Sequence, residues 1–220
     1  MMQTSELNLR VAQEQARKIK RYYTFHSKIY DATRWTFLFG RHWVIDWLPF
    51  GRTEKLTIME IGCGTGYNLK YLAQSYPKAK LIGWDLSKEM LQVAEEKLHS
   101  IPNKYILRND AYGTEGTFAG ASPKADVILF SYCLTMVNPH WQDLLLQAKE
   151  DLKEGGVLAV VDFHDSRFPL FKRWMRKNHV RMESHLLPFL QQHFPTTKHE
   201  VRRAYLGLWH YFLFMGKKES

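Results

Sequence analysis

The residues whose chemistry is easiest to read lie between Glu60 and Gly66, where one carboxylate precedes three glycines spaced two positions apart. Gly62, Gly64 and Gly66 lack a Cβ, so the backbone of such a turn can approach a ligand closely. Glu60 would repel a pyrophosphate, but it can accept hydrogen bonds from a cationic amino group. The glycine spacing also differs from the GxGxxG pattern of dinucleotide-binding loops. The segment predicts a site for a cationic ligand.

Two further carboxylates follow the next apolar runs of the chain. Asp85 lies nineteen positions after Gly66, where a carboxylate can accept hydrogen bonds from both ribose hydroxyls of an adenosine. Asp110 follows the third run, where it can accept from an adenine amino group while a backbone amide meets a ring nitrogen. Either carboxylate alone could equally cap a helix or a turn. All three carboxylates at successive strand ends indicate an adenosine-containing ligand.

The elements that must position these carboxylates alternate between short β-rich runs and helical periodicity, which indicates βαβ units and a parallel sheet. Ser87 is expected to cap one helix, and Asn138 with Pro139 to open another. The expected strands are residues 56–61, 80–84, 105–108, 126–130 and 157–161, followed by an antiparallel pair at 200–205 and 209–215. The predicted fold is α/β: a Rossmann-like, doubly wound, mainly parallel sheet with an antiparallel C-terminal hairpin and helices on both faces.

Three motifs, EIGCGTG at 60–66, GWDLS at 83–87 and RNDA at 108–111, resemble those of class I S-adenosylmethionine-dependent methyltransferases. The resemblance covers residues 56–165 and implies S-adenosylmethionine as the cofactor. It implies that Glu60 and the glycine loop face the methionine part, Asp85 the ribose and Asp110 the adenine. A nicotinamide-dependent reductase would use Asp85 in the same way and is the rival hypothesis. The expected cofactor-binding residues are Glu60, Gly62, Cys63, Gly64, Gly66, Asp85, Leu86, Asp110, Ala111 and Ser131.

Motifs on both flanks of this core resemble a narrower group, the bacterial betaine-lipid methyltransferases. They are YDATRW at 30–35, FGR at 39–41, DFHD at 162–165, NHVRM at 178–182 and HLLP at 185–188. The resemblance implies trimethylation of the amine of diacylglyceryl-homoserine, and an upstream enzyme that supplies this lipid. N-methylation of phosphatidylethanolamine or of another small amine is the alternative.

An amine acceptor must react as the neutral base, in line with the departing sulfur, so a proton acceptor belongs nearby. His164, just past the fifth strand, is the first candidate, although a histidine bonded within a loop is an equally good interpretation. Tyr30 and Tyr132 are the other catalytic candidates. A methylated, cationic product could be held by aromatic rings, and the expected cage is Tyr22, Tyr30, Tyr132 and Tyr205. Trp43 and Trp47, at helical spacing, are expected in the core.

A carboxylate or phosphate on the acceptor would need a cation, which Arg34, Arg41 or Arg181 could supply bidentately. His179 and His185 lie on the segment expected to cover the acceptor, but one helix would not place both on the same face. The expected substrate-binding residues are Tyr22, Arg34, Arg41, His179, Arg181, His185 and Tyr205.

The net charge of +9 is concentrated on the flanks. Residues 1–50 hold eight Lys and Arg against four Asp and Glu, and residues 166–220 hold eleven against three. Basic flanks suit an anionic membrane surface, nucleic acid or an acidic substrate. The [DN]PP[FY] signature of nucleobase amino-methyltransferases is missing after the fourth strand, so nucleic acid is not the expected partner, and an RNA methyltransferase or RNA-binding protein is the weaker alternative. A basic, aromatic helix around 168–177 predicts contact with an anionic membrane.

A chain of 220 residues suits one domain. The expected organisation is a helical lid or membrane-contact segment at 1–50 and a methyltransferase domain at 51–220, with a basic, aromatic acceptor-side insertion at 166–195. No apolar run is long enough to span a bilayer and no signal-peptide pattern is present, so a cytoplasmic protein peripherally associated with the membrane is expected. Cys63 and Cys133 lack metal-site spacing, which predicts reduced thiols and no metal.

Overall fold

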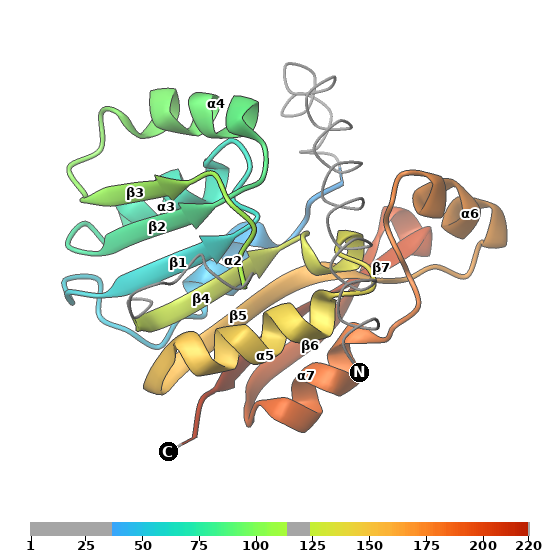
Figure 1. Ribbon diagram of the computed structural model, residues 1–220. Coiled ribbons are helices and arrows are strands. Elements are labelled where there is room, and N and C mark those ends of the chain that lie inside the picture. Colours follow the sequence, from blue (N-terminus) through green and yellow to red (C-terminus); the bar gives the residue numbers. More distant parts are fainter. Residues whose placement is uncertain (1–36, 114–123, 220) are drawn as a thin grey trace, which may run out of the picture.

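The computed structural model describes residues 37–113 and 124–219 of the chain, which form a seven-stranded sheet flanked by helices (Figure 1). The strand order is β3-β2-β1-β4-β5-β7-β6. The strands are β1 (Thr57–Ile61), β2 (Lys80–Trp84), β3 (Tyr105–Arg108), β4 (Ala125–Ser131), β5 (Leu152–Asp165), β6 (Thr196–Ala204) and β7 (Trp209–Lys217). The helices are α2 (Arg41–Asp46), α3 (Tyr67–Ser75), α4 (Lys88–Leu98), α5 (Trp141–Asp151), α6 (Pro169–Lys177) and α7 (Leu186–His193), with short 3₁₀ turns η1 (Leu134–Met136) and η2 (Tyr205–Gly207).

The sheet is doubly wound. Strand β1 pairs in parallel with both β2 and β4, so the direction of winding reverses between these two neighbours. Strand β7 lies antiparallel between β5 and β6. The predicted fold class is confirmed. In such sheets a ligand binds beyond the carboxyl ends of the parallel strands at the reversal point, here the ends of β1 and β4.

Most predicted boundaries are confirmed to within a residue or two, and three differ by more. Strand β6 begins at Thr196, four residues before the predicted 200, because its pairing with β7 continues as far as Gly216. Strand β5 extends beyond the predicted 157–161 at both ends, because β7 pairs with it from Val157 to Asp165 and Leu152 pairs with Ala125 of β4. The prediction that Asn138 and Pro139 open α5 is wrong, since the helix begins at Trp141. Asn138 Nδ2 instead donates to the Thr135 carbonyl at 2.9 Å, so this side chain closes the turn after η1.

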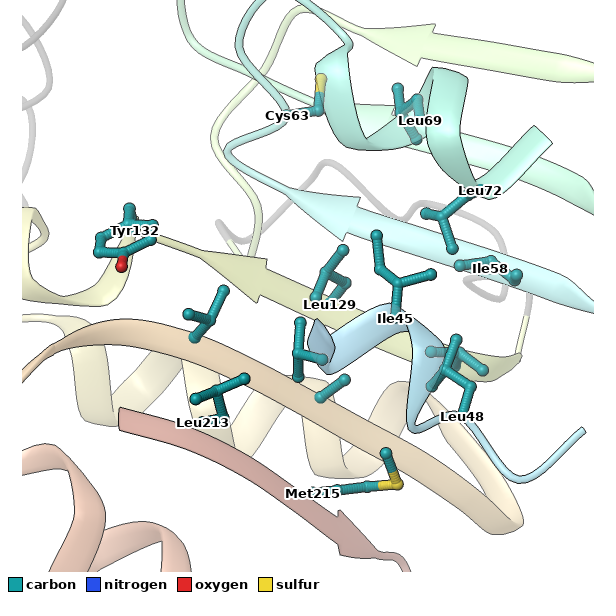
Figure 2. Packing of buried hydrophobic residues seen from close by; sticks show 14 of the residues in the cluster. Ile45, Leu48, Ile58, Cys63, Leu69, Leu72, Leu129, Tyr132, Leu213 and Met215 are labelled. Carbon is teal, nitrogen blue, oxygen red and sulfur yellow. The ribbon is translucent and has the colours of Figure 1, made fainter. Parts of the chain in front are cut away.

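Both faces of the sheet are covered by apolar side chains. On one face, Ile45 and Leu48 at α2 pack with Leu72 of α3 over β1, β4 and β7 (Figure 2). On the other face, α5 and α7 pack on the sheet through residues that include Leu145 and Leu190. The boundary expected at residue 50 therefore does not separate two packing units, because α2 belongs to the domain core. Helix α7, within 166–195, likewise belongs to that core.

The tryptophans of α2 differ from their prediction as core residues. Trp43 is 44% exposed, and Trp47 is half-buried. The Arg202 guanidinium carbon lies 4.2 Å from the centroid of the Trp43 ring, and Lys198 Nζ lies 4.0 Å from that of Trp47. Cations from β6 thus cover part of these rings through cation–π contacts. The prediction is wrong for Trp43.

Candidate cofactor and acceptor site

The glycine turn after β1 adopts the conformation that its sequence predicts. Gly62, Gly64 and Gly66 all have positive φ angles, of 72°, 53° and 72°. A Cβ at Gly62 would lie 2.7 Å from Cys133 Sγ, whereas a Cβ at Gly64 would meet nothing within 4 Å. The turn is therefore packed against the β4 end on one side and open at Gly64, where a ligand can approach the backbone.

Glu60 lies at the buried base of this turn and is only 1% exposed. Its Oε1 accepts a hydrogen bond from Asn68 Nδ2 at 2.7 Å, while its Oε2 has no hydrogen-bond partner in the described structure. Burial raises the pKa of Glu60 to about 8, partly offset by the Asn68 hydrogen bond and by the Arg41 charge. A buried acceptor without a donor suits a ligand that brings a cationic amino group.

Asp85 joins the glycine turn to the start of α4. Its two carboxylate oxygens accept from the backbone amides of Gly64 at 2.8 Å and Ser87 at 2.9 Å. Ser87 caps α4 as predicted, because its hydroxyl accepts from the Met90 amide at 3.2 Å. Each carboxylate oxygen offers two lone pairs, so Asp85 can still accept from ribose hydroxyls.

Asn109 links the ends of β2 and β3. Its Nδ2 donates to the carbonyls of Asp85 and Leu86, both at 3.1 Å. The neighbouring Asp110 is exposed and accepts from the Ala111 amide at 2.9 Å. The structure thus brings Asp85 and Leu86 beside the Asn109–Ala111 segment. The groups at the ends of β1, β2 and β3 fit S-adenosylmethionine in their chemistry. The contacts of Glu60 with the amino group, Asp85 with the ribose and the Asp110 segment with the adenine stay predictions.

The ends of β4 and β5 are joined through Asp162, which is fully buried. Its carboxylate accepts from the Thr135 hydroxyl at 2.6 Å and amide at 3.2 Å, and from the Phe163 amide at 2.8 Å. This contact fixes η1 beyond the end of β4. Tyr132 begins the same loop with a φ of 54°, and its hydroxyl donates to the Phe39 carbonyl at 2.7 Å.

His164 lies at an irregularity in the β5–β7 pairing, where the register shifts between Phe163 and Asp165. Its ring packs edge-on against Phe212, and the ring of His185 packs edge-on against Trp141. His164 Nδ1 and both ring nitrogens of His185 are buried without a partner among the described residues. Burial lowers the pKa of both imidazoles, which favours their neutral forms.

The histidines and the cofactor carboxylates lie toward different faces of the sheet. Phe212 and Trp141, which contact the histidines, belong to the core beneath α5 and α7. Glu60 bonds to α3, and Tyr132 belongs to the core on the α2 and α3 side. The two groups can therefore meet only at the carboxyl edge of the sheet, where β4 and β5 end.

The remaining candidate residues are distributed around this edge. Arg41 Nε donates to the Leu38 carbonyl, and its guanidinium carbon lies 4.0 Å from the Tyr67 ring centroid, beside a hollow of about 300 Å³. Arg181 pairs with Glu183 at 2.7 Å on the surface. His179 is exposed just after α6, with a φ of 64°. Tyr205 is exposed on η2, and Ser131 Oγ is buried at the end of β4. Tyr22, Tyr30 and Arg34 lie outside the described residues.

Some residues that shape the site were not predicted from the sequence. They are Asn68, Asn109 and the hydrogen-bonded pair of Thr135 and Asp162. Asn68 carried a detectable signal, because a polar residue stands on the face of α3 that should be buried. Asn109 and Asp162 belong to sequence motifs, but their hydrogen-bond partners lie 24 and 27 positions away, where no local pattern points to them. Among the described residues no grouping of His, Cys, Asp and Glu could hold a metal ion, and both cysteines are free.

The doubly wound sheet and its carboxylate-lined, glycine-rich edge define a Rossmann-like domain. Residues 59–158 match the family model described as "Methyltransferase domain". This segment is therefore similar to methyltransferase domains, and S-adenosylmethionine is the cofactor that its motifs and this match indicate.

Curated relatives match the same part of the chain. A trans-aconitate 2-methyltransferase of Afipia carboxidovorans is 37% identical over 110 residues, which is 50% of this chain and 39% of that protein. A malonyl-[acyl-carrier protein] O-methyltransferase of Halalkalibacterium halodurans is 41% identical over 59 residues, 27% of this chain and 22% of that protein. The matches thus span well under two thirds of the length of these relatives.

Solved structures share the fold over a larger part of the chain. Phosphoethanolamine N-methyltransferase 2 of Haemonchus contortus, bound to phosphomonomethylethanolamine and S-adenosylhomocysteine, has a TM-score of 0.70 at 15% identity, covering 91% of this chain and 60% of that one. Geranyl diphosphate C-methyltransferase of Streptomyces coelicolor has a TM-score of 0.68 at 12% identity, covering 81% and 74%. At these identities the likeness concerns the fold.

Proposed function

We infer that this chain transfers methyl groups from S-adenosylmethionine to the amine of a lipid, with diacylglyceryl-homoserine as the acceptor and a trimethylated betaine lipid as the product. The main support for an amine as the acceptor is the pair of desolvated histidines, His164 and His185, beside the end of β5. Burial lowers the pKa of both imidazoles and favours the neutral form, which is the form that can accept a proton from the acceptor amine. The choice of this lipid rests on the sequence resemblance of the flanks.

The bound cofactor supplies an electrophilic methyl group on a sulfonium. Glu60 holds the amino group of its methionine part, and Asp85 holds its ribose. The Thr135–Asp162 contact fixes the loop that faces the acceptor. His164 accepts the proton that the acceptor amine must lose before it attacks. The aromatic faces of Tyr132 and Tyr205 favour the cationic, methylated amine, each by about 0.5–2 kcal/mol.

Arg41 suits the anionic part of the acceptor. It is half-buried, borders a hollow and lies close enough to Glu60 to influence its pKa. A guanidinium can bind either the carboxylate of homoserine or the phosphate of phosphatidylethanolamine bidentately. Arg41 therefore supports an acceptor that carries both an amine and an anion, and the test must separate these two lipids.

The test supplies methyl-labelled S-adenosylmethionine to diacylglyceryl-homoserine, phosphatidylethanolamine and RNA in separate detergent-containing assays. We expect label in diacylglyceryl-homoserine, with mono-, di- and trimethylated products resolved by mass. Label in phosphatidylethanolamine alone would replace the substrate with that lipid. Label in RNA alone would overturn lipid methylation altogether.

Carboxylate O-methylation is the second candidate. The relatives that match in sequence carry names for O-methylation or for methylation of trans-aconitate, and Arg41 could hold an acidic acceptor. A carboxylate needs no proton acceptor, so the two buried histidines would then be without a role. Assays with trans-aconitate and with malonyl-acyl carrier protein test this candidate, and activity there that is absent with every amine would establish it.

A further inference from the structure

Five large apolar side chains gather on the surface formed by α6 and η2. They include Leu170, which is 78% exposed, and Leu206, whose side chain is exposed at 107% of its reference area. Burying such side chains is normally favourable, so an exposed group of them marks an interaction surface. We call this surface the α6–η2 patch, and its members are Phe168, Leu170, Trp174, Tyr205 and Leu206.

The two halves of the patch are joined through Trp209, which is buried beneath them. The Phe171 ring of α6 stacks on Trp209 with centroids 5.5 Å apart, and the Tyr205 ring lies 4.9 Å from it. Ser166 Oγ also donates to the Leu208 carbonyl, which ties the start of the α6 segment to the turn before β7. The two elements that carry the patch, α6 and η2, are therefore packed on the same buried ring.

The backbone presents Leu206 to solvent at some cost. Tyr205 and Leu206 have φ angles of 47° and 56°, in the left-handed region that residues with a Cβ rarely adopt. Leu206 is fully exposed among the described residues, so burial of its side chain there does not offset the cost of this conformation. Strain of this kind at an exposed position suggests a role in binding.

Basic side chains surround the patch. On α6, Leu170 and Trp174 are one turn apart on one side of the helix, while Arg173 and Lys177 are one turn apart on the neighbouring exposed side. Arg167 lies beside Gly207, with its guanidinium nitrogen 3.9 Å from the Cβ position of that glycine. Apolar side chains flanked by Lys and Arg complement an anionic lipid surface, in which the former insert and the latter meet headgroups.

The patch is also connected to the acceptor side of the site. The Tyr205 ring packs edge-on against Phe39 with centroids 5.6 Å apart, and the Phe39 carbonyl accepts the hydrogen bond from the Tyr132 hydroxyl. Two contacts therefore lead from the exposed turn to the loop after β4. A lipid headgroup entering beside Tyr205 would have a short path to the reacting edge of the sheet.

We propose that the α6–η2 patch docks the protein on an anionic phospholipid bilayer, with Leu170, Trp174 and Leu206 inserted among the lipids. This proposal rests on the proposed function, because an acceptor that resides in a bilayer requires such a surface. No helix in the described ranges is long and apolar enough to cross a membrane, so the contact proposed is peripheral.

The experiment uses the full chain and vesicles of either phosphatidylcholine alone or phosphatidylcholine mixed with phosphatidylglycerol. We expect co-sedimentation with the mixed vesicles that weakens as salt is added. Leu170→Ser combined with Leu206→Ser should weaken binding at least tenfold, and Arg173→Gln with Lys177→Gln by about fivefold for each charge removed. Matched controls are Leu146→Ser on α5, whose leucine is 43% exposed, and Lys78→Gln with Lys88→Gln. These controls should bind as the wild type does.

A polarity-sensitive dye attached to Leu206→Cys should shift to the blue on adding mixed vesicles, whereas the same dye on Leu146→Cys should not. Selective labelling is feasible because Cys63 is buried and Cys133 is partly buried. Equal binding by the patch variants and the wild type would overturn the proposal. So would a dye at position 206 that is already shifted without vesicles, since another part of the chain or a second copy would then cover the patch.

The docking surface and the proposed function can fail separately. Vesicle binding that depends on the patch, without methylation of any lipid, would sustain the surface and remove the lipid as acceptor. Equal methylation of detergent-dispersed lipid by the wild type and the patch variants, without vesicle binding, would sustain the function and remove the surface.

Discussion

Two buried carboxylates, Glu60 at the end of β1 and Asp162 near the end of β5, stand in the two halves of the site and are bonded very differently. Glu60 accepts one side-chain hydrogen bond, and its second oxygen has no partner in the described part of the chain. Asp162 accepts from the Thr135 hydroxyl and from backbone amides. Burial raises the pKa of Glu60 to about 8 and that of Asp162 to about 6. The difference indicates that Glu60 has an oxygen available to bind a ligand, whereas the hydrogen bonds of Asp162 stabilise the loop after β4.

The largest effect is expected in the acceptor half, at His164. Replacing the proton acceptor by His164→Gln should lower turnover about 100-fold, since a positioned base typically contributes this much or more. The affinity for S-adenosylhomocysteine should stay unchanged, because the cofactor groups belong to the other half. Single-turnover kinetics and calorimetry measure the two quantities separately.

His210→Gln is the matched control for His164, because that histidine lies close enough to influence the pKa of His164. It should change the pH dependence of turnover slightly and its maximum very little. If His164→Gln retains full turnover, His164 has no part in proton transfer, and His185→Gln becomes the variant to measure.

The next effect concerns the pH dependence of cofactor binding in the Glu60 half. A carboxyl with a pKa of about 8 is protonated at lower pH and must lose its proton to hold a cationic amino group. The affinity for S-adenosylhomocysteine should therefore rise about tenfold per pH unit between pH 6 and pH 7 and level off above pH 8. Calorimetry in buffers of different ionisation enthalpy should detect about one released proton at neutral pH.

Glu60→Gln should remove this pH dependence and bind like the wild type at pH 6 but at least tenfold more weakly at pH 8. Glu96→Gln, on the exposed face of α4, is the matched control. The raised pKa of Glu60 also means that the cofactor-free protein loses stability as the pH rises from the usual glutamate range through 8. The Glu60→Gln variant should therefore be more stable than the wild type above pH 8. A loss of stability there would contradict the assignment of Glu60 as a ligand-binding residue.

Asp162→Asn should have the opposite outcome in the other half. An asparagine directs its amino group toward donors, so at least one backbone amide or the Thr135 hydroxyl loses its acceptor. The expected cost is about 2 kcal/mol of unfolding free energy, or roughly 4–8 °C in Tm. Cofactor affinity of the folded fraction should stay unchanged. A weakened cofactor affinity without loss of stability would reverse the roles given to the two carboxylates.

The two halves of the site also differ in how much of each can be predicted from the sequence. The Glu60 half is built from strand–turn–helix segments, so the glycine turn, Asp85 and the Ser87 cap followed from local patterns. The acceptor half depends on contacts between distant segments: Thr135 with Asp162, and Tyr132 with Phe39, 93 positions apart. No periodicity encodes such pairs. The shifted register at His164 arises from pairing with β7, and the contact of Arg202 from β6 with the partly exposed Trp43 ring also joins distant segments.

The smallest effect is expected from Tyr132→Phe. This variant tests whether the hydroxyl or the aromatic ring of Tyr132 contributes to methyl transfer. The Tyr132 hydroxyl donates to the Phe39 carbonyl, so its loss removes the donor from a partly buried carbonyl, at a cost of about 1 kcal/mol. The aromatic face, which would stabilise a methylated amine, is retained. Turnover should therefore fall only a few-fold, with an unchanged ratio of mono-, di- and trimethylated products, whereas Tyr132→Leu should reduce the later methylations selectively. A loss of 100-fold or more in Tyr132→Phe would show that the hydroxyl itself takes part in the reaction, and the acceptor half would then contain a second proton-transferring group beside His164.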